Sequence, residues 1–212
     1  MADIIIKALT PELIEDYFDF FDNRAFSDGY PYYPCYCNAF HLSLNQIKTD
    51  LYAKAKVYSD GQDGWKRALR ESAWRMVESG KICGYLAYDN ELAIGWCNAN
   101  DRLNYYRVGE FDIDDAPEDS VPSYCPNRGY IKSIVCFEIS SGSRGQGIAR
   151  QLLETVCQDA IKEGYSFVEA YPKDKDKDSN MSFTGPYKLY EQVGFHEYAH
   201  DGSTVIMRKS LR

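Results

Sequence analysis

A short glycine-containing loop is the feature of the chain that points most directly to chemistry. Residues Ser143–Ala149 read Ser-Arg-Gly-Gln-Gly-Ile-Ala, between the apolar run Ile131–Ile139 and an amphipathic segment. This order predicts a strand, a loop and a helix start, and the free backbone N–H groups at a helix start bind phosphate. Gly145 and Gly147 lack a Cβ, so the main chain can approach an anion closely, and Arg144 adds a charged donor. The sequence therefore predicts a site for a phosphate-bearing ligand.

Several kinds of site share such a loop. A nucleotide P-loop ends in Gly-Lys-Ser/Thr, which is missing here. A dinucleotide fold needs an acidic residue about twenty positions further on. Glu169 lies near that distance, but about 140 residues precede the loop without the alternation of strands and helices that such a fold requires. An ordinary turn, in which glycine only relieves backbone strain, stays open as a third interpretation.

A second motif downstream favours a different interpretation. The run that begins at Arg144 is followed by Leu189-Tyr190-Glu191-Gln192-Val193-Gly194-Phe195. Together the two motifs resemble the GNAT superfamily of acyl-CoA-dependent N-acetyltransferases. The signature of that family, Arg/Gln-x-x-Gly-x-Gly/Ala, is matched by Arg144, Gly147 and Ala149, and its late helix commonly ends in Leu-Tyr-x-x-x-Gly-Phe.

Apolar periodicity and turn residues predict elements in an order that also resembles this family. The first half is expected to hold a strand at Ile4–Leu9, helices at Thr10–Phe21, Ser43–Tyr58 and Trp65–Gly80, and a hairpin of Ile82–Tyr88 with Glu91–Ala99. The resemblance implies a mixed α/β fold over residues 1–212, as one domain. Its central sheet would be twisted, mostly antiparallel and flanked by helices, with strands splayed at the acyl-CoA site. Regions 22–64 and 100–129 carry no family pattern and are expected on the acceptor side.

The resemblance also implies which residues bind the donor, with acetyl-CoA as the co-substrate and no metal. Main-chain groups on the strand before the loop, at Phe137, Glu138 and Ile139, would pair with the pantetheine arm and polarise the thioester carbonyl. The CoA pyrophosphate would be held by the loop residues Arg144, Gly145, Gln146, Gly147, Ile148 and Ala149.

Catalysis needs a neutral amine, so the site must remove a proton. Some relatives use a glutamate on the strand before the loop, where this chain has Ser133. Glu138 is the nearest carboxylate on that strand and one candidate base, with ordered water or desolvation of the amine as alternatives. Tyr190 is the preferred catalytic candidate, as a donor to the departing thiolate, with packing around a short helix as its alternative role. Many relatives carry an asparagine seven residues earlier, where this chain has Phe183.

The aromatic segment Tyr30–His41 has two interpretations, a wall of the acceptor pocket or local core under a proline-rich loop. Its Cys35, Cys37 and His41 lack the second ligand pair of a zinc module. The acidic stretch Glu110–Asp119 would either attract an amine or lie in solvent as a loop.

Composition limits the partners and the compartment. A net charge of −8 argues against nucleic acid, and no run of apolar residues is long enough for a membrane span. Seven cysteines, an odd number, fit reduced thiols in the cytoplasm. We expect a cytoplasmic N-acetyltransferase acting on a primary amine of a small cationic molecule. A protein lysine or N-terminal acetyltransferase, a non-catalytic acyl-CoA-binding regulator, and a homodimer paired through Thr204–Lys209 stay open.

Overall fold

The protein is built around a seven-stranded sheet with the order β1-β2-β3-β6-β7-β9-β8. The structure, a computed structural model, describes residues 3–28, 34–58, 61–108, 111–112, 130–174, 183–201 and 204–212. Neighbouring strands of the sheet are antiparallel except β6 and β7, which are parallel. The sheet strands are β1 (Ile4–Ala8), β2 (Gly84–Asp89), β3 (Leu92–Asp101), β6 (Ile131–Ile139), β7 (Phe167–Ala170), β8 (His196–Asp201) and β9 (Thr204–Ser210). A separate ribbon pairs β4 (Arg107–Val108) with β5 (Phe111–Asp112).

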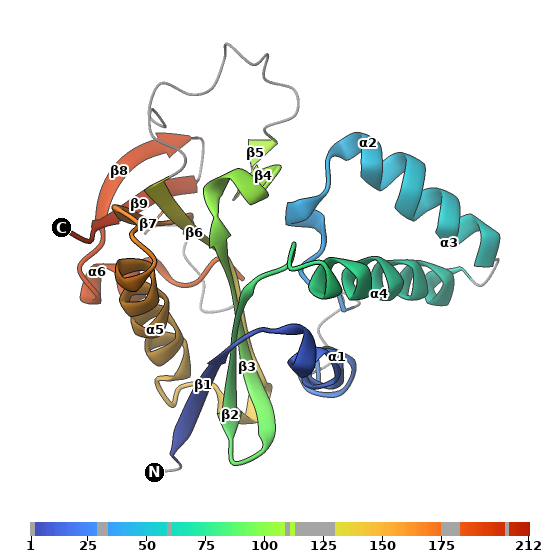
Figure 1. Ribbon diagram of the computed structural model, residues 1–212, viewed down its shortest axis with the longest axis horizontal. Helices are drawn as coiled ribbons and strands as arrows, with labels where there is room; N and C mark the ends of the chain where they lie inside the picture. Colours follow the sequence, from blue (N-terminus) through green and yellow to red (C-terminus); the bar gives the residue numbers. More distant parts are fainter. Residues whose placement is uncertain are drawn as a thin grey trace.

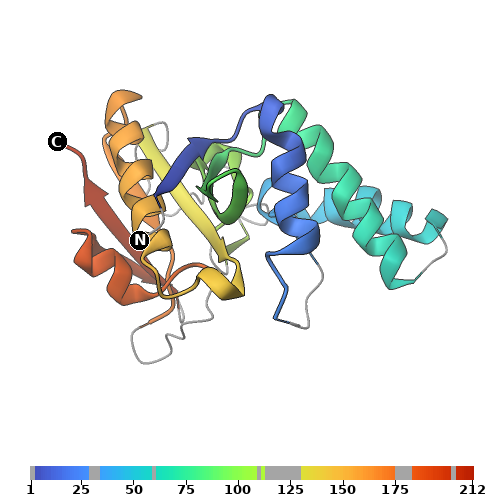
Figure 2. The same ribbon diagram turned by 90° about the horizontal axis from the view of Figure 1, so that it is seen from below.

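Helices cover both faces of this sheet (Figure 1). On one side lie α1 (Ile14–Asn23), α2 (Leu44–Gln46), α3 (Tyr52–Tyr58) and α4 (Gln62–Glu78). On the other side lie α5 (Ile148–Lys162) and α6 (Tyr187–Gln192). Figure 2 shows the same separation from below, with α5 across the sheet from α1 and α4. Short turns complete the chain: η1 (Pro11–Leu13), η2 (Ala39–His41), η3 (Ile47–Leu51), η4 (Arg102–Asn104) and η7 (Ser141–Ser143).

The two faces of the sheet belong to two separate hydrophobic cores. Trp96 on β3 packs with the α1 and α4 side, whereas its neighbour Cys97 packs with the α5 side. β2 alternates in the same way, because successive side chains of a strand point to opposite faces. In β6 the alternation is interrupted where its register with β3 shifts: Val135 and Cys136 both pack on the α1 side, and Phe137 returns to the α5 side. Among the candidate site residues of β6, Phe137 therefore faces α5, and the next residue, Glu138, faces α1.

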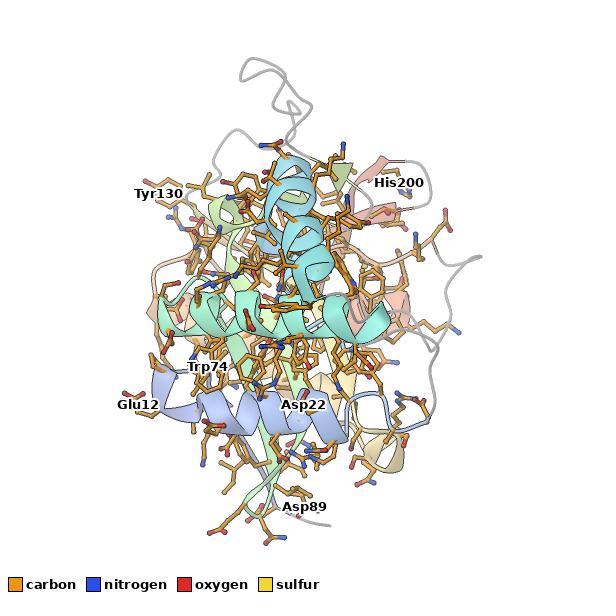
Figure 3. The ribbon with its side chains drawn as sticks, turned by 90° about the vertical axis from the view of Figure 1, so that its right-hand side faces the viewer. Glu12, Asp22, Trp74, Asp89, Tyr130 and His200 are labelled. Carbon is orange, nitrogen blue, oxygen red and sulfur yellow. The ribbon has the colours of Figure 1, made fainter. Side chains whose placement is uncertain are left out.

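Aromatic and charged contacts join α1 to α4. The rings of Phe18 and Trp74 stack with centroids 5.1 Å apart, and the Arg70 guanidinium lies 4.5 Å from the Phe18 ring. Arg70 also pairs with Asp22 at 3.0 Å. Figure 3 shows Asp22 and Trp74 in the layer between the two helices. These contacts hold α1 and α4 together as one layer.

The mixed α/β class predicted from the sequence is confirmed, and two helix predictions need correction. The first helix opens with η1, and Thr10 gives no side-chain cap to it. The helix expected at Ser43–Tyr58 contains the π-helical turn η3, although Ser43 does form a capping box with Gln46. Strand β8 was not predicted. None of the helices in the described part of the chain is long and apolar enough to span a membrane.

Candidate active site

The predicted anion loop lies between β6 and α5, and two left-handed glycines shape it. Gly145 and Gly147 have φ angles of 77° and 80°, a region in which residues with a Cβ are strained. A Cβ added at either position would meet no atom within 4 Å, so glycine is required here by backbone conformation and not by crowding. The residues from Gly145 to Gly147 are exposed to solvent. The loop therefore presents its main chain to any ligand that approaches.

The start of α5 supplies the donors of this loop. Gly147 is the N-cap and provides no side chain to cap the helix, and the first helical hydrogen bond runs from the Gln151 amide to the Gly147 carbonyl at 3.1 Å. The preceding amides of the first turn have no acceptor within the helix. A helix of 15 residues adds a partial positive charge at that end. This arrangement suits a diphosphate.

The predicted splay is present between β6 and β7. The two strands pair only from Ile131, opposite Phe167, to Ile134, opposite Ala170. Beyond this point β6 stays paired with β3 as far as Ile139. The second half of β6 therefore has one edge that does not pair with a strand in the described part of the chain.

A short segment before α6 contacts this edge. The Phe137 amide donates to the Phe183 carbonyl at 2.7 Å, and the Tyr190 hydroxyl donates to the Thr184 carbonyl at 2.6 Å. Gly185, with φ of +83°, lies so close that an added Cβ would be 2.9 Å from the Tyr190 hydroxyl. The carbonyls of Phe183 and Thr184 thus accept hydrogen bonds from the Phe137 amide and the Tyr190 hydroxyl. These are the two groups that the resemblance to GNAT proteins implies lie beside the thioester.

Tyr190 lies fully buried on the α5 side of the sheet. Its ring contacts those of Phe137 and Phe195, with centroids 6.4 and 5.4 Å away. Because Phe137 is opposite Cys97 in the register, all these rings belong to the core beneath α5. The structure therefore brings together Phe137 and Tyr190, which lie far apart in the sequence.

Glu138 lies on the other side of the sheet. It is opposite Trp96 in the register, so it shares the face covered by α1. Its side chain is 16% exposed, and Arg144 Nη2 lies 3.4 Å from its Oε1. Burial raises the pKa of the Glu138 carboxyl to about 7, Arg144 opposes part of that rise, and the nearby Asp28 adds to it. Glu138 and Tyr190 are thus directed to opposite faces around the same stretch of β6.

Cys37 and His41, from the aromatic segment, pack inside the protein. The Trp96 indole donates to the Cys37 thiol at 3.2 Å, and both side chains are buried. His41 contacts Asn104 and Asn98, and burial lowers its pKa to about 4, so it is neutral at pH 7. Among the described residues no group of three or more His, Cys, Asp or Glu side chains is arranged to hold a metal.

Part of the sequence-based prediction falls outside the described residues. Of the aromatic segment, residues 30–33 are not described. Of the acidic stretch, only Phe111 and Asp112 are described, as β5. The acceptor roles predicted for these stretches stay predictions.

A comparison with known proteins identifies the family. The model of the Acetyltransferase (GNAT) family matches residues 47–195, more than half of the chain. The protein belongs to the GNAT family. It is therefore an acyltransferase, as its sequence predicted.

Solved GNAT structures share the fold. The GNAT acetyltransferase from Listeria monocytogenes aligns with a TM-score of 0.53 at 11% identity, covering 99% of this chain and 98% of that chain. The PaiA N-acetyltransferase from Thermoplasma acidophilum, in complex with coenzyme A, aligns with a TM-score of 0.52 at 13% identity, covering 98% and 99%. The GNAT domain of PAT from S. lividans gives 0.52 at 13%, covering 97% and 89%. A search of curated proteins found no match.

Ser133, the residue that stands where the resemblance places a glutamate in some relatives, is buried. Ser133 lies opposite Glu169 in the register, and its hydroxyl is 2.8 Å from the hydroxyl of Tyr171, which donates to Glu169 at 3.2 Å. Glu169 is fully buried and pairs with Arg208 at 2.7 Å. The Glu169 carboxylate on β7 is therefore part of a buried hydrogen-bond network within the sheet. Glu138 on β6 is partly exposed by contrast.

Asp28 is a site residue that the sequence did not indicate. Its carboxylate lies 2.5 Å from Arg144, yet the two residues are 116 positions apart. No local pattern reports such a pair, because neither the spacing nor the composition of the segment after α1 relates it to the loop.

We predict that Gly147→Asp weakens CoA binding by at least about tenfold, because a carboxylate at the loop would repel the diphosphate. Isothermal titration calorimetry with CoA would measure the affinity. Gly164→Asp is the matched control, since Gly164 lies at the other end of α5 with a similar φ of 84° and equally open space. Equal affinity of the two variants for CoA would refute the loop assignment.

Proposed function

We propose that the protein transfers the acetyl group of acetyl-CoA to a primary amine of a small cationic molecule, by direct attack in a ternary complex. The observation that carries the proposal is the exposed glycine loop at the uncapped start of α5, next to the edge of β6 that pairs with no strand in the described part of the chain. Coenzyme A in the PaiA N-acetyltransferase structure, which shares this fold, supports the choice of donor.

In this proposal the loop amides from Arg144 to Ala149 bind the diphosphate. The pantetheine arm runs along the edge of β6 that β7 does not cover, where the main chain of Phe137 to Ile139 meets it. Because the Phe137 amide is directed away from β3, it can donate to the thioester oxygen once the Phe183 carbonyl is exchanged for that oxygen.

Proton removal from the amine falls to Glu138. An alkylamine with a pKa near 10.4 loses its proton at pH 7 at a cost of about 4.6 kcal/mol, so a nearby base is needed. A carboxyl with a pKa of about 7 suits this role, because a base works best near the operating pH. The Glu138 carboxylate takes one proton from the ammonium, and the neutral nitrogen then attacks the thioester carbon.

Departure of the thiolate falls to Tyr190. As the new C–N bond forms and the C–S bond breaks, negative charge collects on sulfur, and the acylated nitrogen releases its remaining extra proton to water or to the departing thiolate. The Tyr190 hydroxyl, which now donates to Thr184, would turn to the sulfur and stabilise that charge by a hydrogen bond. Full transfer of its proton would be uphill by roughly 2 kcal/mol with unperturbed pKa values, so hydrogen bonding is its main contribution.

A cationic acceptor suits the charge of this region. Two carboxylates, Glu138 and Asp28, share one arginine at the acceptor face, and the chain as a whole carries −8. We place the reaction in the cytoplasm, because the six cysteines within the described residues are all free thiols.

A panel of small amines incubated with acetyl-CoA and a thiol reporter tests the proposed function. Small di- and polyamines should release CoA faster than neutral or anionic amines. Release with lysine peptides or protein N-termini alone would instead favour a protein acceptor. No release with any amine, together with tight CoA binding, would favour a regulator that binds acyl-CoA without catalysis.

We predict that Glu138→Gln lowers kcat/KM on the order of a hundredfold and removes an acidic limb from its pH profile. In the wild type, kcat/KM should rise as pH increases through about 7, because only the ionised carboxylate accepts a proton. Glu154→Gln, at an exposed ion pair on α5, is the control and should leave the limb in place. A wild-type profile in Glu138→Gln would exclude this base.

We also predict that Tyr190→Phe lowers kcat by at least about tenfold with little change in the affinity for CoA. The matched control is Tyr187→Phe, one turn earlier in α6, whose hydroxyl donates to Glu197 instead. Steady-state kinetics and calorimetry would separate the two effects. If Tyr190→Phe kept wild-type turnover, the tyrosine would have only a packing role.

A further inference from the structure

Arg144 joins two carboxylates near the end of β6. Its Nε donates to the Ile139 carbonyl at 3.0 Å, which fixes the guanidinium against the strand. Its Nη1 lies 2.5 Å from Asp28 Oδ2, and its Nη2 lies 3.4 Å from Glu138 Oε1. Asp28 belongs to the segment that follows α1. A single arginine, anchored to the backbone, therefore orients carboxylates from two distant segments.

A second contact ties the same segments together. Ser27, next to Asp28, lies with its hydroxyl 3.0 Å from that of Ser141 in η7, just before the glycine loop. Two consecutive residues after α1 thus contact the connection between β6 and α5. The position of Asp28 beside Arg144 is therefore supported by a second contact between the segment after α1 and the connection from β6 to α5.

Sharing Arg144 between Asp28 and Glu138 changes the electrostatic surroundings of Glu138. An arginine paired with Glu138 alone would favour the carboxylate form and make it a poor base. Asp28 has the shorter contact and offsets the guanidinium charge. Burial and Asp28 raise the pKa of Glu138, whereas Arg144 lowers it. The thiols of Cys35 and Cys136 also face this carboxyl.

We propose that Arg144 and Asp28 are positioning residues for proton removal, in which Arg144 holds the Glu138 carboxylate in place and Asp28 offsets the arginine so that Glu138 accepts the proton of the amine. The inference rests on the proposed function, in which Glu138 is the base. It gives the Arg144 side chain a role separate from that of its loop amide.

The pH profile of kcat/KM tests this pair with changes of opposite sign. Asp28→Asn removes a negative charge, so that the Arg144 charge acts on Glu138 alone and favours its carboxylate form. The midpoint of the acidic limb should therefore fall by roughly one pH unit. Arg144→Gln removes the positive charge, so the limb should move up by a similar amount. Asp28→Glu keeps the charge and should restore the wild-type limb.

Asp19→Asn is the matched control, because Asp19 also forms an aspartate–arginine pair, with Arg24 at 2.5 Å. It should leave the limb where it is. If Asp28→Asn shifted the limb no further than Asp19→Asn, or if Arg144→Gln moved it downward, the positioning role would be refuted.

A measurement without turnover separates this inference from the proposed function. NMR titration of isotope-labelled glutamate side chains, with Glu138 assigned from Glu138→Gln, reports its ionisation directly. Opposite shifts of that titration in Asp28→Asn and Arg144→Gln, in a protein inactive with every amine, would support the pair while rejecting the enzyme proposal. If the protein is active with an amine but the Glu138 titration is the same in Asp28→Asn and Arg144→Gln as in the wild type, the positioning role of Arg144 and Asp28 is rejected and the proposed function is kept.

Discussion

The site depends on one constraint in the sheet: β6 pairs with β3 along its length but with β7 over only four residues. Full pairing on both edges would use every backbone group of the strand. Because β7 ends its pairing at Ala170, the Phe137 amide is left to the segment before α6. The loop to α5 follows directly at the end of β6, so the strand edge that β7 leaves uncovered lies next to the anion loop.

The alternation of side chains along β6 then divides the chemistry between two faces. Phe137 points into the core beneath α5, where Tyr190 lies, whereas Glu138 points to the face covered by α1. The backbone of one strand separates the group suited to the leaving thiolate from the group suited to the incoming amine.

Elements with local signals were predictable from the sequence. The apolar run at Ile131–Ile139 matches β6, and the glycine before Ile148 matches the start of α5, because both patterns act through neighbours in the chain. The contact of Asp28 with Arg144 and the direction of the Tyr190 hydroxyl were not predictable. They depend on segments that folding brings together from far apart, and no periodicity or turn residue encodes such meetings.

The two separate cores have a consequence for how such a protein changes over generations. Substitutions among α1 to α4 alter what surrounds Glu138, yet they leave intact the packing of Phe137, Tyr190 and the start of α5. Under the proposed function, the preference for one amine can then change through the helical layer separately from the binding of the thioester. One strand shared by two separately packed cores therefore allows the residues proposed to meet the amine and those proposed to meet the thioester to be substituted independently.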